Sequence, residues 1–167
     1  MVALVAMMVA AAPSEACREH YAALRYRDAI VSCTDALAAT ADRGELYRLI
    51  GLSLAGVGEI DKARRVFAAL LALEPGAALP GGLSPKLTAP FEAARADATP
   101  VLLGATRDAD ELIISITDGA SRPVAELRVG SSRMARTERT RAPAGAVRVT
   151  ALDVLGGELA SVEVAAV

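Results

Sequence analysis

The sequence predicts an α+β chain in two parts, a helical part over residues 14–97 and an antiparallel β part over residues 98–167. Three observations support this division. All five aromatic residues lie between Tyr21 and Phe91. Apolar residues recur at helical spacing in the same region. From about Thr99 the chain changes to short runs of Val, Ile, Thr and Leu separated by Gly, Pro and Asp, which is typical of strands joined by turns.

The first twelve residues, "MVALVAMMVAAA", carry no charge. They are too few for a transmembrane helix, which needs about 20 apolar residues. An apolar run that ends in small residues predicts a secretory signal peptide over residues 1–13, and the alternative is an apolar first helix. Sixteen of the 18 basic residues are Arg and alanine is abundant, which indicates a bacterial source. We therefore expect a periplasmic or envelope-associated bacterial protein.

Two cysteines, Cys17 and Cys33, are present. Export to an oxidising compartment makes them candidates for a disulfide. The alternative is two free cysteines that act as small buried apolar residues. His20 is the only histidine, so the usual four-ligand zinc site is not expected. We predict no metal and no cofactor.

Residues 44–75 predict an α-hairpin. Tyr47 opens a helical apolar pattern, and Gly56 and Gly58 end it by permitting a tight turn. A second helix begins near Ile60 and is stopped at Pro75. The same pattern recurs 34 residues upstream, where three pairs share one phase: Ala29 with Ala63, Cys33 with Phe67, and Ala36 with Leu70. A fixed period of this length indicates a helical repeat.

This segment resembles the tetratricopeptide repeat (TPR). Seven positions carry the resemblance at the spacing of that family: Tyr47, Ile50, Gly51, Leu54, Ala63, Phe67 and Pro75. The first copy departs from the pattern at Cys17 and His20. The helix predicted after Ser84-Pro85 would cap the open end of the two repeats. The resemblance implies a groove that binds a peptide or helix of another protein, lined by residues on the first helix of each pair: Arg18, Tyr21, Arg48, Leu49, Leu52 and Ala55.

The β part predicts strands at "ELIISITD" (111–118) and "PVAELRVGS" (123–131), and a polar edge strand at "MARTERTRAP" (134–143). Residues 145–167 predict a hairpin with its turn at Leu155-Gly156-Gly157. The stretch "VRVTALDVLGGELAS" resembles the last hairpin of immunoglobulin-like and fibronectin-type-III-like domains. Short strands at this spacing, together with that resemblance, favour a small β-sandwich.

The sequence gives little support for an enzyme. Gly51, Gly56 and Gly58 lack the Lys-Ser/Thr and the preceding strand that a phosphate loop requires. A hydrolytic triad needs a base, and the single histidine lies in helical phase. A net charge of −2 argues against a nucleic-acid binder. No small-molecule substrate is evident, and the acidic residues Asp108, Asp110 and Glu111 are interpreted as a solvated turn.

The densest charged feature is a group of four arginines with one interrupting glutamate: Arg133, Arg136, Arg139 and Arg141. One interpretation is a charged edge strand that prevents sheets from pairing with each other. The other is a contact for an anionic partner.

From these patterns we expect a non-enzymatic adaptor or scaffold of the bacterial cell envelope. We expect it to be one component of an envelope complex and to bind another protein through the TPR-like groove. The alternative is a ligand-binding or regulatory module that contacts an anionic partner through the arginine-rich strand.

Overall fold

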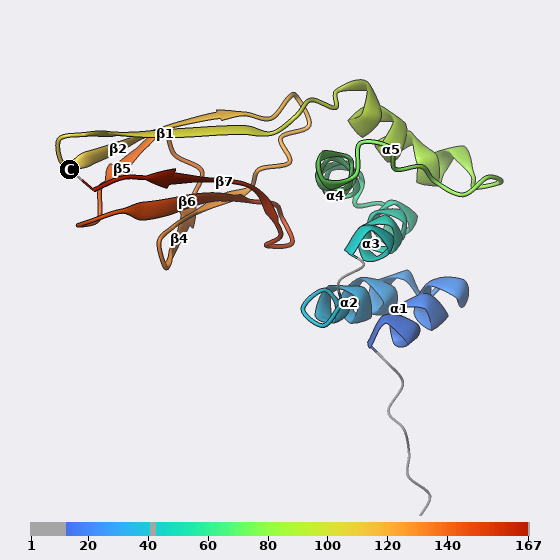
Figure 1. The fold of residues 1–167 in the computed structure, drawn as a ribbon. Coiled ribbons are helices and arrows are strands. Elements are labelled where there is room, and N and C mark those ends of the chain that lie inside the picture. Colours follow the sequence, from blue (N-terminus) through green and yellow to red (C-terminus); the bar gives the residue numbers. More distant parts are fainter. Residues whose placement is uncertain (1–12, 41–42, 167) are drawn as a thin grey trace, which may run out of the picture.

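The computed structural model describes residues 13–40 and 43–166, and within these residues five helices precede seven antiparallel strands (Figure 1). The predicted α+β arrangement, with the helical part first, is therefore confirmed. The signal peptide predicted over residues 1–13 lies, apart from Pro13, outside the described residues. Within the described ranges, none of the helices has the length and apolar character needed to cross a membrane.

The helices follow one another as a stack in which each packs against the next: α1 (Pro13–Ala22), α2 (Tyr26–Ala36), α3 (Arg43–Val57), α4 (Ile60–Leu73) and α5 (Pro85–Ala96). The central helix α3 also contacts α1 and α5. Gly58 lies between α3 and α4 with a φ of +88°, a conformation that glycine adopts without strain. The turn predicted at this position is confirmed.

The helical core forms around two aromatic rings. Phe67 lies directly against Gly51, where any side chain would collide with the ring, so this glycine permits α3 and α4 to approach closely. The Phe67 ring meets Phe91 edge to face, with 5.3 Å between the ring centroids. Phe91 and Ala94 are buried, and α5 begins with Pro85 in its first turn. The helix predicted to cap the repeats therefore covers α3 and α4.

A disulfide joins Cys17 on α1 to Cys33 on α2. Both cysteines are fully buried. Of the two alternatives that the sequence left open, the structure contains the bonded pair.

The strands form two sheets: β1 (Leu102–Asp108), β2 (Glu111–Thr117), β3 (Glu126–Val129), β4 (Ser132–Ala135), β5 (Arg139–Arg141), β6 (Val147–Leu152) and β7 (Glu158–Val164). One sheet has the order β1-β2-β5 and the other the order β4-β3-β6-β7. Side chains from both sheets share one apolar core, which includes Leu112, Leu127 and Val149. The arrangement is sandwich-like.

Two features of the β part differ from the sequence-based expectation. Strand β1 was not predicted, because its residues include Gly104 and Ala105 and alternate only weakly in polarity. The single edge strand predicted over residues 134–143 is wrong, since the chain forms β4 and β5 there and these strands belong to different sheets. The terminal hairpin is confirmed as β6 and β7, which pair from Val147 to Val164.

We predict that replacing both cysteines, as Cys17→Ala/Cys33→Ala, lowers the free energy of unfolding of the helical part by about 3 kcal/mol. The disulfide closes a loop with a sequence separation of 16, and the loss of that constraint favours the unfolded chain. Tyrosine fluorescence in urea measures this part selectively, because all three tyrosines belong to it. Wild-type protein treated with a reductant should show the same loss, and unchanged unfolding curves for both would contradict the prediction.

Candidate functional site

The helical and β parts are joined by a buried hydrogen bond. The Tyr47 hydroxyl on α3 donates to Asp153 Oδ2 over 2.5 Å, and the two residues are 106 positions apart in the sequence. Asp153 follows β6, where its other carboxylate oxygen accepts the backbone N–H groups of Leu155 and Gly157. Asp153 is 1% exposed. One carboxylate therefore shapes the β6–β7 turn and attaches that turn to the central helix.

The surroundings of the Tyr47 hydroxyl are closely packed. Burial raises the pKa of Tyr47 strongly, and the hydrogen bond to the Asp153 carboxylate raises this pKa further. A side chain at Gly157 would collide with both the hydroxyl and the carboxylate. Leu155 and Leu159 of the same hairpin pack against the helical core. The absence of a side chain at Gly157 therefore leaves room for the hydrogen bond between the two parts.

A second polar contact links the parts near the start of the β part. Arg64 on α4 donates from Nε to the Ser121 hydroxyl over 3.0 Å and also pairs with Asp97 at the end of α5. The Ser121 hydroxyl donates to the same Asp97 carboxylate over 3.3 Å. The loop between β2 and β3 is therefore held against the helical part.

The groove expected on the first helix of each pair is formed only in part. Leu52 and Ala55 are 1% and 0% exposed, because α1, α4 and α5 surround α3 on several sides. They belong to the helical core and present almost no surface to a partner. Arg18 on α1 pairs with Glu45 on α3 at 2.5 Å. Leu49 is half-buried against the core.

Tyr21 is also half-buried, and its ring lies 6.0 Å from that of Tyr26. Burial raises the pKa of the Tyr21 hydroxyl, and the neighbouring Tyr26 raises it further. The Tyr21 ring on α1 therefore packs against the start of α2 and the helical core.

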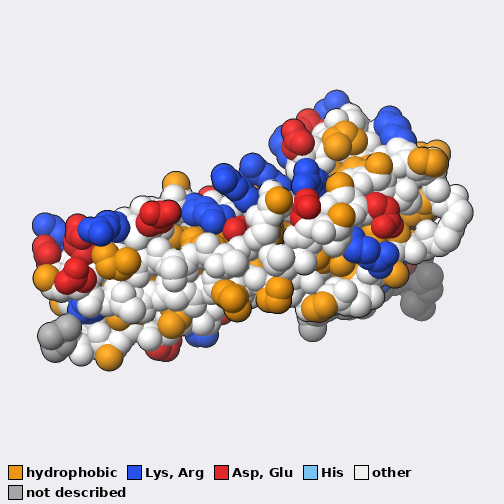
Figure 2. All heavy atoms as spheres, turned by 90° about the horizontal axis from the view of Figure 1, so that it is seen from above, with side chains coloured by type: hydrophobic (Ala, Val, Ile, Leu, Met, Phe, Trp, Pro, Cys, Tyr) orange, Lys and Arg blue, Asp and Glu red, His pale blue; other side chains and the backbone are white. Residues whose placement is uncertain are grey.

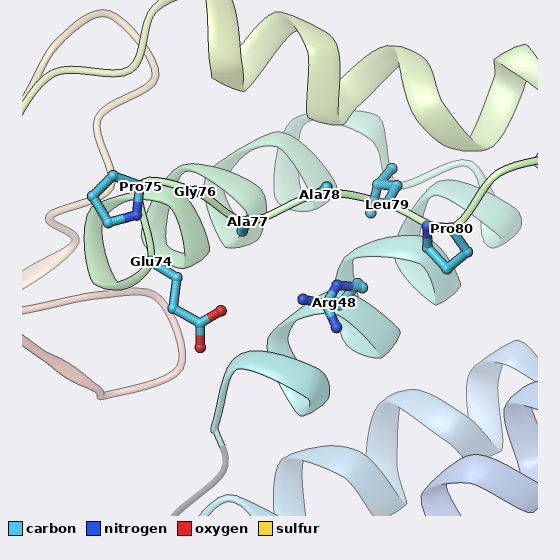
Figure 3. A pocket seen from close by; sticks show the side chains of 8 residues that line it. All are labelled: Arg48, Glu74, Pro75, Gly76, Ala77, Ala78, Leu79 and Pro80. Atoms are coloured by element: carbon cyan, nitrogen blue, oxygen red, sulfur yellow. The ribbon is translucent and has the colours of Figure 1, made fainter.

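Arg48 is the groove residue that lines an open cavity (Figure 3). The cavity has a volume of about 530 Å³ and lies between α3 and the segment that follows α4, residues 74–80. The Arg48 side chain extends from α3 into the space between this helix and residues 74–80. Its Nε atom is buried, and no residue in the described part of the chain accepts a hydrogen bond from it. The cavity thus combines the Arg48 side chain with a largely apolar lining.

The same cavity contains a carboxylate, that of Glu74. This group lies against the backbone of Gly44 in the first turn of α3, at a position that a side chain on residue 44 would occupy. Negative charge near a helix N-terminus is stabilised by the helix dipole. The segment after Glu74 is tied down by Ala77, which is buried and whose carbonyl accepts a hydrogen bond from Arg95 over 3.1 Å. Sequence reasoning missed this segment, since Gly, Ala and Pro give no periodic signal.

The four arginines of the expected anionic site do not form one cluster. Arg133 lies on β4 in the four-stranded sheet, whereas Arg139 and Arg141 lie on β5 in the other sheet. Arg136 lies between these strands and pairs with the buried Asp118 over 2.7 Å. Arg139 pairs with Glu111 at 3.3 Å, and both side chains of that pair are exposed.

A cleft of about 940 Å³ brings Arg136 and Arg139 together with Arg122, a residue that sequence reasoning missed. Arg122 lies in the β2–β3 loop with a φ of +45°. No periodic pattern in its local sequence predicts that it lines the same cleft as the other two arginines. Within residues 13–40 and 43–166, no group of three or more His, Cys, Asp or Glu side chains is arranged to hold a metal ion.

Comparison with protein-family models, with curated proteins and with solved structures returned no match to this chain.

We predict that Tyr47→Phe lowers the free energy of unfolding by about 2 kcal/mol, because it leaves the buried Asp153 Oδ2 without its donor. Urea unfolding followed by circular dichroism measures the loss. Tyr21→Phe is the matched control, since no hydrogen bond from its hydroxyl is required for its ring packing, and it should cost less than about 0.5 kcal/mol.

The pH dependence of the free energy of unfolding gives a second readout. The folded protein keeps the Tyr47 proton that the unfolded chain releases above about pH 10, so stability falls as the pH rises above that value. Tyr47→Phe should flatten this decline, and an unaltered decline would contradict the assignment.

We predict that Arg136→Gln destabilises the β part by about 2 kcal/mol, because it removes the charged partner of the buried Asp118. Arg139→Gln, which breaks only an exposed pair, should cost less than about 1 kcal/mol. The Val124 amide reports the difference, since it donates to Asp118 Oδ2 over 3.2 Å. Hydrogen exchange at Val124 should accelerate in Arg136→Gln and not in Arg139→Gln. Equal exchange rates in the two variants would show that the buried pair has no structural role.

Proposed function

We propose that this protein is a non-catalytic adaptor of the bacterial cell envelope, which binds another protein through the cavity between α3 and residues 74–80. The observation that carries the proposal is the Arg48 side chain, whose buried Nε has no acceptor among the described residues and which lines a cavity of about 530 Å³. A partner that inserts a side chain or an extended segment there would bury apolar surface and contact the half-buried Arg48 side chain. Both contributions favour binding.

The TPR-like interpretation of the helical part supports this proposal. Its helices pack in sequence, Gly51 lies against Phe67, and Ala63 is fully buried, and these observations support the resemblance. Helical repeats of this kind commonly present a surface to protein partners. The immunoglobulin-like or fibronectin-type-III-like identity of the sandwich also belongs to this proposal and rests on the β6–β7 hairpin.

The disulfide supports export. Disulfides persist in oxidising compartments such as the bacterial periplasm and are rare in the cytosol. The Cys17–Cys33 bond, together with the apolar segment predicted as a signal peptide, favours an envelope location.

Site-specific photo-crosslinking tests the cavity. A photo-reactive residue is placed at the exposed Ala78 on the cavity rim, and in a control protein at the exposed Asp35 on α2. In the producing cells, position 78 should crosslink one discrete partner and position 35 should not. The yield should fall at least tenfold in Arg48→Glu. Arg27→Glu, the same charge change at an exposed site on α2, should leave it unchanged. Crosslinks that form equally at both positions, or that persist in a folded Arg48→Glu variant, would contradict the proposal.

A further inference from the structure

The edge of strand β2 is only partly covered. On one side β2 pairs with β1 over its whole length, from Glu111 to Thr117. On the other side β5 pairs only with the first three residues, 111–113, and the Ile114 N–H donates to the Glu138 carbonyl over 2.8 Å. Residues 115–117 therefore have no strand partner on that side within the described chain.

The unpaired backbone groups belong to Ile116. In an antiparallel strand the N–H and C=O of one residue point to the same side, and the side alternates from residue to residue. Since the Ile114 N–H points toward β5, the N–H and C=O of Ile116 point to the same, open side. Ser115 and Thr117 point instead toward their β1 partners. Unpaired groups of this kind form a template on which another strand can add.

Arginine side chains line the space beside this edge. The cleft of about 940 Å³ is bounded by β2 residues 113–116 and by Arg122, Arg136 and Arg139, with Glu138 as the one acidic residue of the lining. Arg136 is held by the buried Asp118, and Arg139 is held only by an exposed pair. The lining therefore carries a net positive charge, and Arg139 can exchange its partner at small cost.

The basic surface continues onto the helical part. A neighbouring cavity of about 210 Å³ shares Arg122 and is lined on its other side by Arg64 and Arg65 of α4, together with Asp61. Figure 2 shows Lys and Arg side chains gathered at the bend where the β part meets the helices. A bound peptide that extended from the cleft toward α4 would therefore meet the further positive charges of Arg64 and Arg65.

We propose that the open edge of β2 at residues 114–117 binds an extended acidic segment of a partner protein, which adds to the sheet as a strand while its carboxylates meet Arg122 and Arg139. The unpaired groups of Ile116 require a backbone as the ligand, and the arginines require negative charge on its side chains. The outer edge of β1 is a poorer candidate because β1 lies against β7. This surface is separate from the Arg48 cavity, so the inference goes beyond the proposed function and does not depend on it.

A defined peptide tests both requirements on the full chain. The probe is a fluorescein-labelled octapeptide of alternating Glu and Thr. A second version is N-methylated at two adjacent central residues, which keeps every charge and removes one backbone donor from each edge of the peptide. In fluorescence anisotropy the unmodified peptide should bind at least tenfold more tightly than the methylated one. A third version with Lys in place of Glu should not bind.

Protein variants locate the site. Arg122→Glu/Arg139→Glu should weaken binding of the acidic peptide at least tenfold, while Arg133→Glu/Arg27→Glu, with the same charge change at two exposed positions elsewhere, should leave it unaltered. Ile116→Pro removes the unpaired N–H without removing a hydrogen bond to β1, and it should abolish binding if circular dichroism shows the fold retained. In wild-type protein the peptide should slow hydrogen exchange at the Ile116 amide and leave the already paired Ser115 amide unchanged.

Three results would overturn the proposal. Equal affinity for the methylated and unmodified peptides would show that charge alone drives binding. Unchanged exchange at Ile116 in the saturated complex would place the peptide elsewhere. A dimer in sedimentation experiments that Ile116→Pro abolishes, and that the acidic peptide fails to dissociate, would show that a second copy of the chain occupies the edge.

Discussion

A buried carboxylate, that of Asp153, joins the two parts of the molecule. It accepts one hydrogen bond from Tyr47 and two from the backbone of its own turn, and it does so while almost completely buried. A buried carboxylate that lost one of these donors would retain an uncompensated desolvation cost. The Asp153 carboxylate therefore stabilises both the β6–β7 turn and the attachment of the sandwich to α3. Loss of either set of hydrogen bonds leaves this carboxylate with an unsatisfied charge.

This attachment determines what lies at the bend between the parts. With the β6–β7 turn held against α3, the β2–β3 loop lies beside α4, where Arg64 binds Ser121 and Asp97. Arg122 follows directly and is shared by the two basic cavities. The positive surface therefore depends on the contact between the two parts. Its arginines come from α4, from the β2–β3 loop, and from β5 and the residues that precede it.

Sequence reasoning predicted the fold class because its evidence is local. The spacing of Ala63 and Phe67, and the alternation of Val147 and Val149, follow from the geometry of a single helix or strand. The sequence-based prediction of exposed groove residues is wrong where the burial of a side chain depends on residues distant in the sequence. Leu52 and Ala55 lie on the face expected for a groove, yet other helices cover them.

The polar contacts that define the candidate surfaces are also non-local. The hydrogen bond between Tyr47 and Asp153 joins residues 106 positions apart, and no periodic pattern in the sequence predicts it. The four arginines were expected to act together because they are close in sequence. The turn between β4 and β5 sends them to different sheets and leaves Arg139 beside Arg122 instead. Only the three-dimensional arrangement identifies that pair.

The two proposed surfaces lie on different parts of the molecule, which gives the junction a functional consequence. The Arg48 cavity belongs to the helical part and the β2 edge to the sandwich. Tyr47 lies one residue from Arg48 on α3, so the residue that anchors the sandwich is adjacent to the residue that lines the cavity. Two partners bound at these surfaces would be held in one fixed relation, because the helix that contacts the first also carries the hydrogen bond that positions the sheet for the second. A flexible linker would impose no such relation. Under the proposed function, the junction would therefore orient the two partners as well as bring them together.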